Sequence, residues 1–147
     1  MRGSRWIRLV LCGFVAGVVW NVLSAVFLYL FAPGFVASVQ RSAPYSRWGG
    51  EFFFGVDVVM GIWAMWLYSA IAPRYGAGPT TAAIAGVACW TIKGLQSAKW
   101  AGLGLVPPGS VLVVLAATSL VAVLGASVVG GWLYDKVHRP AAQGLPG

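Results

Sequence analysis

Few residues in this chain of 147 could do chemistry, and most of those lie inside long apolar runs. Asp57 is the one acid in its run, and Lys93 lies near the middle of a later run. If these runs cross a bilayer, each charge costs roughly 2.5–3.5 kcal/mol near the helix centre, so each needs a partner. An antiparallel hairpin of the two runs would allow an Asp57–Lys93 ion pair, because a lysine stem can rise several ångströms. Gln96 and Ser97 follow Lys93 by one helical turn, and Asn21 lies near the centre of the first run, so all five form a candidate polar seam.

The polar seam has two interpretations. Charged residues inside membranes often mark a pathway, so the seam could be a polar pocket linked to a proton or a substrate. It could equally be a satisfied ion pair that fixes the register of the hairpin. Transporters usually present several exchangeable carboxylates or a broken helix, and the sequence shows neither clearly. We therefore favour the structural interpretation.

Motifs for catalysis, metals and cofactors are missing from the sequence. It contains no C-x-x-C pair and no H-E-x-x-H, and its one histidine, His138, lies near the C-terminal end. The two cysteines, Cys12 and Cys89, lie inside apolar runs, where a thiol behaves as a small apolar side chain. We predict no catalytic residue, no metal and no cofactor, and we do not expect an enzyme.

The composition indicates what surrounds these residues. Apolar residues make up 59% of the chain and charged residues 9%, with a mean hydropathy of +0.81. A soluble domain is near 45–50% apolar and about 25% charged, and a disordered chain is less hydrophobic still. The net charge of +7 comes from cations beside apolar runs, which favours contact with lipid headgroups over nucleic acid. The sequence predicts an integral membrane protein.

Four segments are long enough to cross a bilayer, which takes about 20 apolar residues. We place the transmembrane helices at approximately 9–31, 52–72, 80–105 and 111–134, with an outer loop at 32–51 and a tail at 135–147. Short links rich in proline and glycine, such as Pro73–Pro79, force neighbouring helices to be antiparallel. We expect Pro73 to stop one helix, Pro79 to start the next and Ser110 to cap the last. The predicted fold is a single all-α membrane domain, a polytopic antiparallel bundle of four transmembrane helices.

The distribution of Lys and Arg predicts the orientation of this bundle. With the N-terminus inside, six of the loop and tail cations face the cytoplasm and two face outward: Arg2, Arg5, Arg8, Arg74, Lys136 and Arg139 against Arg41 and Arg47. Both termini are therefore predicted to be cytoplasmic, and the tail at 135–147 with them. Arg74, beside the membrane, is a candidate contact for lipid headgroup phosphates or, alternatively, for a cytoplasmic partner.

Small residues recur at helical spacing in the apolar runs. Gly13 and Gly17 form a G-x-x-x-G step, and Ala82 and Gly86 do likewise in the third run. Such faces let two helices approach closely. They serve either packing within the chain or dimerisation, and four helices that need inner faces favour packing within the chain.

A motif in the second hairpin resembles a group of known proteins. Residues Trp66 to Ala82, followed by Ala85-Gly86 and Trp90, and the later Gly131–Tyr134, are similar to small bacterial four-helix integral membrane proteins of unassigned function. Ala72 and Thr80 depart from the pattern, since those proteins often carry basic residues there. The resemblance implies the same fold and a bacterial source, and it implies no activity.

These observations lead to one expected function and one alternative. We expect a non-enzymatic accessory or interaction subunit of the bacterial cytoplasmic (inner) membrane, whose partners are membrane lipids and a protein partner or further copies of itself. The alternative is a small oligomeric transporter or channel-like protein that uses the Asp57–Lys93 seam.

Overall fold

The computed structural model describes residues 2–41, 45–102 and 109–138, apart from the side chains of 2–4, 39, 45–50, 53, 96–102, 110 and 138. Within these ranges the fold is all-α, with five helices and no strand. The helices are α1 (Arg2–Phe31), α2 (Pro33–Gln40), α3 (Tyr45–Tyr75), α4 (Pro79–Gly102) and α5 (Gly109–His138).

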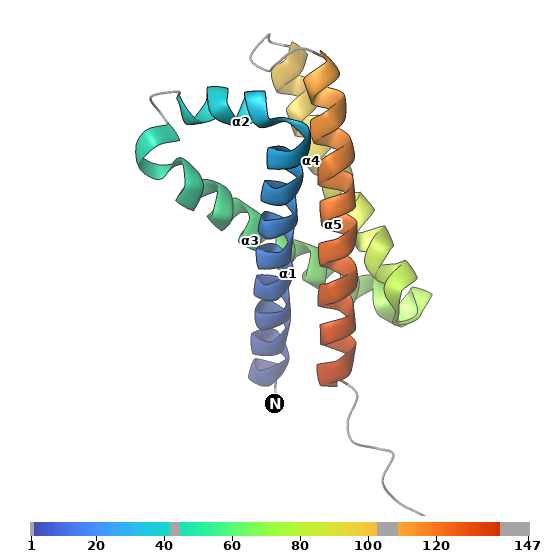
Figure 1. The fold of residues 1–147 in the computed structure, drawn as a ribbon. Helices are drawn as coiled ribbons and strands as arrows, with labels where there is room; N and C mark the ends of the chain where they lie inside the picture. Colours follow the sequence, from blue (N-terminus) through green and yellow to red (C-terminus); the bar gives the residue numbers. More distant parts are fainter. Residues whose placement is uncertain (1, 42–44, 103–108, 139–147) are drawn as a thin grey trace, which may run out of the picture.

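The four long helices alternate in direction. Figure 1 shows α1 and α5 side by side and antiparallel, with α4 beside α5, while α3 crosses behind α1 at a steep angle. The short α2 lies across the end of α1. The beginning of α1 and the end of α5 lie at the same end of the bundle, where Arg8 on α1 donates a hydrogen bond to the carbonyl of Val137.

In the part of the chain that the structure describes, three helices are long and apolar enough to cross a membrane. The candidate spans are Arg5–Phe31 in α1, Phe54–Tyr75 in α3 and Val111–Val137 in α5. These correspond to the first, second and fourth predicted segments, whereas α4, which carries Lys93, is not among them. Large apolar side chains such as Trp63 and Val113 are exposed, as expected for helices that face lipid.

Glycine sets the contact between α1 and α3. A methyl group at Gly13 would lie 2.5 Å from the Cα of Ile62, and one at Gly17 would lie 2.7 Å from the backbone oxygen of Asp57. Gly61 on α3 faces the backbone of both α1 glycines at equally short range. The two backbones therefore touch, and the prediction that the G-x-x-x-G step packs within the chain is confirmed.

Small residues also join α4 to α5. A methyl group at Gly86 would lie 2.7 Å from Ser127 Oγ, and one at Gly131 would lie 2.9 Å from the Cβ of Ala82. A methyl group at Gly130 would lie 2.8 Å from the sulfur of Met65, and one at Gly131 would lie 3.5 Å from the ring of Tyr68. These two glycines of α5 thus make room for Met65 and Tyr68, two fully buried side chains of α3.

The helices extend beyond the predicted membrane segments. Residues 33–40 and 45–51 of the predicted outer loop are helical, since Pro33 starts α2 and α3 begins at Tyr45. The prediction that Pro73 stops its helix is wrong, because the helix continues to Tyr75 and proline removes only one backbone donor near a helix end. The helix α5 continues through Asp135 to His138, four residues into the predicted tail.

The structure describes the turn before α4, whereas residues 103–108 after α4 lie outside the described residues. Pro79 begins α4 as predicted, after a turn in which Gly76 has a φ of +86° that only glycine adopts readily. The last helix begins at Gly109, so Ser110 lies within α5 and not before its first residue as predicted.

Candidate functional site: a polar cluster between α1, α3 and α4

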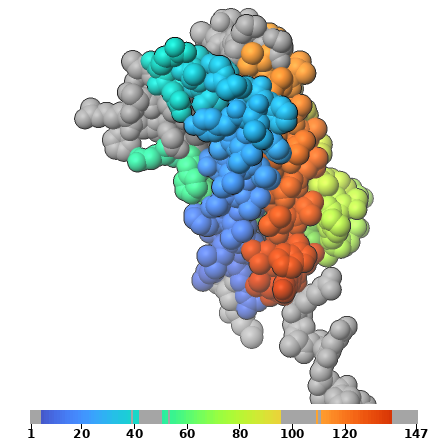
Figure 2. Space-filling model, in the orientation of Figure 1, coloured from blue at the N-terminus to red at the C-terminus, as the bar shows by residue number. Residues whose placement is uncertain are grey.

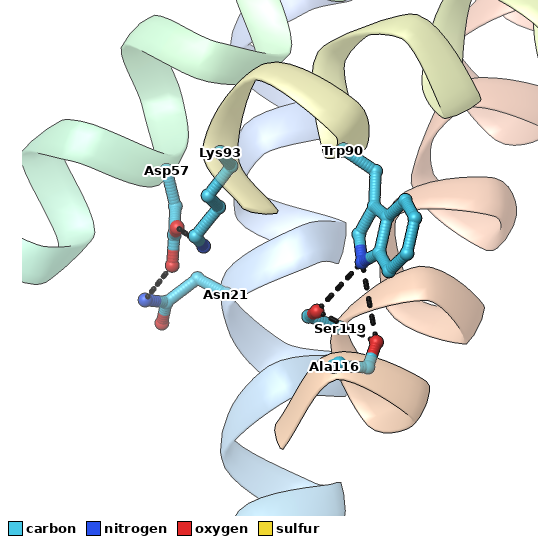
Figure 3. Close-up of polar contacts among 6 residues, drawn as sticks. All are labelled: Asn21, Asp57, Trp90, Lys93, Ala116 and Ser119. Carbon is cyan, nitrogen blue, oxygen red and sulfur yellow. Dashed lines mark hydrogen bonds and ion pairs between the residues drawn. The ribbon is translucent and has the colours of Figure 1, made fainter. Parts of the chain in front are cut away.

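Three helices each contribute one polar side chain to a cluster around Asp57, which is 7% exposed. The Nδ2 of Asn21 donates a hydrogen bond of 3.0 Å to Asp57 Oδ2. The Nζ of Lys93 lies 3.8 Å from Asp57 Oδ1, which is ion-pair distance. Figure 3 shows the carboxylate of Asp57 between these two partners. We call Asn21, Asp57 and Lys93 the polar cluster.

The glycine contact explains why Asn21 reaches Asp57. Gly17 lies one helical turn before Asn21, and it lets the α1 backbone touch α3 at Asp57 and Val58. Residues four apart share a helix face, so Asn21 follows Gly17 directly onto the carboxylate. The small residue that brings the helices together therefore also positions the amide donor.

The members of the polar cluster differ in exposure. The side chain of Lys93 is 39% exposed, whereas that of Asp57 is 10% exposed. The Nζ of Lys93 also lies 4.9 Å from the centre of the Trp20 ring, whose π face attracts a cation. Lys93 thus contacts an acid and an aromatic ring, while part of its stem stays at the surface of the bundle.

The other predicted site residues lie apart from the cluster or outside the description. Gln96 and Ser97 belong to α4, but their side chains are not among those the structure describes. Arg74 is exposed in the last turn of α3, where a cation suits the negative end of the helix dipole. Arg74 does not join the polar cluster.

One tie between α4 and α5 has no counterpart in the sequence analysis. The Nε1 of Trp90 donates hydrogen bonds to Ser119 Oγ at 3.0 Å and to the carbonyl of Ala116 at 3.2 Å (Figure 3). The side chain of Trp90 is half-buried, and because both of its acceptors lie on α5, these bonds restrict the rotation of α4 relative to α5. They thereby help to hold Lys93, three residues later, on the α3 side.

A second polar site, also missed from the sequence, lies at the end of the bundle where α5 stops. The hydroxyl of Tyr68 contacts both carboxylate oxygens of Asp135, at 2.8 and 2.7 Å, and accepts a hydrogen bond of 3.0 Å from the backbone of Gly78. The rings of Tyr68 and Tyr134 meet edge to face with centroids 5.9 Å apart. The sequence does contain one signal for this site, since Asp135, one of only three acids, directly follows an apolar run that ends in tyrosine.

The described residues offer little else for chemistry. Among them, no group of three or more His, Cys, Asp and Glu side chains is placed to hold a metal ion. Cys12 and Cys89 are both buried, unbridged and part of the same core cluster. The polar cluster is therefore the one predicted site that the structure assembles from this part of the chain, and it combines one acid, one base and one amide.

Comparisons with protein-family models, curated proteins and solved structures gave no match. The resemblance of the second hairpin to small bacterial membrane proteins thus stays a prediction. The function of this chain is therefore inferred from the geometry of its own residues.

Proposed function

We propose that this chain is a non-enzymatic accessory or interaction subunit of the bacterial cytoplasmic membrane. In this proposal four helices cross the membrane as an antiparallel bundle and both ends of the chain face the cytoplasm. The bundle would serve as a scaffold whose outer faces contact lipids and a protein partner or further copies of the chain.

The observation that carries the proposal is that each carboxylate oxygen of Asp57 has a partner within the chain. The two oxygens have different partners, Asn21 for one and Lys93 for the other. A carboxylate that binds a transported ion or proton must exchange partners, whereas a structural carboxylate keeps them. Breaking such a pair leaves one charge uncompensated, so a satisfied pair supports a structural role.

The arrangement of the helices supports the proposed topology. The long helices alternate in direction, and the beginning of α1, the turn before α4 and the end of α5 lie toward one end of the bundle. Most of the loop and tail cations belong to this end, and cytoplasmic loops carry an excess of Lys and Arg. The pairing of Lys93 with Asp57 would lower the cost of placing α4, the least apolar long helix, in the membrane.

Native mass spectrometry of the protein, extracted in mild detergent from its own membrane, tests the proposal. We expect a second, different protein or further copies of the chain at fixed stoichiometry. A monomer that carries only lipid would contradict the interaction role.

A small transporter or channel-like protein is the second candidate, and the exposure of Lys93 is the observation that favours it. A lysine side chain that is 39% exposed can reach the surface of the bundle and so connect Asp57, its ion-pair partner, with a pathway for protons. Proton uptake into proteoliposomes, followed with an enclosed pH dye, distinguishes the two functions. The transporter predicts uptake that Asp57→Asn abolishes and Glu51→Gln retains, and the subunit predicts uptake at the level of empty liposomes.

A further inference from the structure

A groove lies between α5 and the start of α4, at the end of the bundle that holds Tyr68 and Asp135. Its volume is about 690 Å³. One wall is formed by Gly78 and Pro79 at the start of α4, and the other by five residues of α5: Val128, Val129, Trp132, Asp135 and Lys136. Figure 2 shows the beginning of α4 standing beside the lower part of α5. A groove of this size is in the range of small-molecule sites, about 300–1,000 Å³.

The lining of the groove changes from apolar to charged along α5. Val128 and Val129 lie within the candidate span Val111–Val137, and Asp135 and Lys136 lie at its end. From Val128 to Lys136 the helix advances about 12 Å, at 1.5 Å per residue. Between them is Trp132, 59% exposed, a residue type that is enriched at the boundary between lipid and water. The groove therefore has the polarity of a phospholipid, apolar at one end and ionic at the other.

The ionic end carries both signs of charge. The Nζ of Lys136 lies 4.8 Å from the centre of the Trp132 ring, so the cation is held over the groove wall. Asp135 is half-buried, and although Tyr68 binds it, each carboxylate oxygen has a further lone pair. Asp135 and Lys136 both line the groove, so it presents a negative and a positive group to a headgroup that has a phosphate and an ammonium two carbons apart.

We propose that this groove binds a phospholipid with a phosphoethanolamine headgroup. The phosphate pairs with Lys136, the primary ammonium donates to Asp135, and an acyl chain covers Val128 and Val129. A trimethylated headgroup has no N–H to donate to Asp135, so the site prefers phosphatidylethanolamine to phosphatidylcholine. The site is separate from the polar cluster, and it needs neither proposed function to be correct.

Lipid titration followed by native mass spectrometry tests the proposal. Dioleoyl phosphatidylethanolamine, phosphatidylcholine and phosphatidylglycerol are added separately to delipidated protein. We expect the first to bind about fivefold more tightly than the other two, as for a half-exposed charge contact. Equal binding of phosphatidylethanolamine and phosphatidylcholine, or tighter binding of phosphatidylglycerol, would overturn the assignment.

Three variants locate the site. Asp135→Asn should bring phosphatidylethanolamine and phosphatidylcholine to within about twofold of each other, and Lys136→Gln should weaken both by a similar factor. Glu51→Gln, which removes an exposed acid outside the groove, should keep the wild-type preference. A preference that survives in Asp135→Asn, or one lost in Glu51→Gln, contradicts this site. Lys136 is exposed, so its variant tests the groove even if Asp135→Asn fails to fold.

The source of the headgroup is tested with glycerophosphoethanolamine, which has the same charges and no acyl chains. We expect it to bind at least about tenfold more weakly than the lipid, because no apolar chain covers Val128 and Val129. Equal binding would mean that a free phosphoethanolamine compound occupies the groove, and it would overturn the lipid assignment.

Discussion

Two side chains from other helices contact the carboxylate of Asp57, and this makes a definite prediction for variants. Asp57→Asn and Lys93→Met should each lower the free energy of unfolding by about 1–3 kcal/mol, which is less than for a fully buried pair because Lys93 is partly exposed. The double variant should recover part of that loss, because neither charge is left alone. Thermal unfolding of the four proteins in detergent measures the coupling.

Glu51→Gln is the control for this cycle, since Glu51 lies on the same helix and is exposed. Its effect should stay within about 0.5 kcal/mol. Strictly additive losses in the double variant would show that Asp57 and Lys93 do not depend on each other, and would remove the main support for a structural pair.

Tyr68 is the second residue for which the contacts predict a cost. Tyr68→Phe removes one hydroxyl and leaves both the Asp135 carboxylate and the Gly78 backbone N–H without their partner. We expect a loss of about 1–3 kcal/mol in the free energy of unfolding, measured by thermal unfolding in detergent. Tyr75→Phe, at a tyrosine 63% exposed on the same helix, should change stability by less than about 0.5 kcal/mol. Equal effects of the two would contradict the bridging role of Tyr68.

At the scale of the helix, the crossing of α1 and α3 depends on two backbones in contact. Gly17→Ala forces a methyl group against Val58 and the carbonyl of Asp57, and neither is a flexible side chain that could move away. We expect a loss of about 1–3 kcal/mol on thermal unfolding in detergent, together with a weaker Asp57 site. Gly55→Ala is the matched control, because nothing lies within 4 Å of its new methyl group. It should be neutral or stabilising by up to about 1 kcal/mol, since alanine favours helix.

If Gly55→Ala destabilised the protein as much as Gly17→Ala, the α1–α3 contact would not be the cause. Unfolding in increasing concentrations of a denaturing detergent gives an independent measure of the same ranking.

The helices could be predicted from the sequence better than their contacts could. The apolar runs located α1, α3 and α5, because hydrophobic length is a strong signal. The spacing of Gly13 and Gly17 indicated a close contact but not its partner, since Gly61 has no such step in its own helix. The Asp57–Lys93 pair was a prediction from two charges in an antiparallel hairpin, and the Nζ of Lys93 lies 3.8 Å from Asp57 Oδ1. Trp90 with Ser119 could not be predicted, because it depends on the rotation of two helices about their axes.

At the scale of the whole molecule, the orientation and the number of crossings can be measured together. In a background of Cys12→Ala and Cys89→Ala, single cysteines are placed at exposed positions by Arg41→Cys, Ala77→Cys and Val137→Cys. With four crossings and both termini inside, a membrane-impermeant maleimide should label only Arg41→Cys in intact cells. The other two should react only after lysis.

Each other labelling pattern has its own meaning. Labelling of Ala77→Cys in intact cells, with Arg41→Cys protected, would invert the orientation. Labelling of Val137→Cys together with Arg41→Cys would mean that α4 does not cross while α3 and α5 do, which is a molecule with three crossings. The parent protein, with Cys12 and Cys89 intact but buried, should stay unlabelled throughout.

The bond between Tyr68 and Asp135 joins residues 67 positions apart, and this has a consequence for how the protein is made. The ribosome synthesises the turn between α3 and α4 long before Asp135, whose carboxylate binds Tyr68 beside that turn. Until synthesis reaches the end of α5, the Tyr68 hydroxyl has only the Gly78 amide as a partner. A message that ends before codon 135 therefore yields a chain that has nearly all of its long apolar helices but lacks the contact that closes this end of the bundle. Tags for expression belong after His138, where they leave this last step intact.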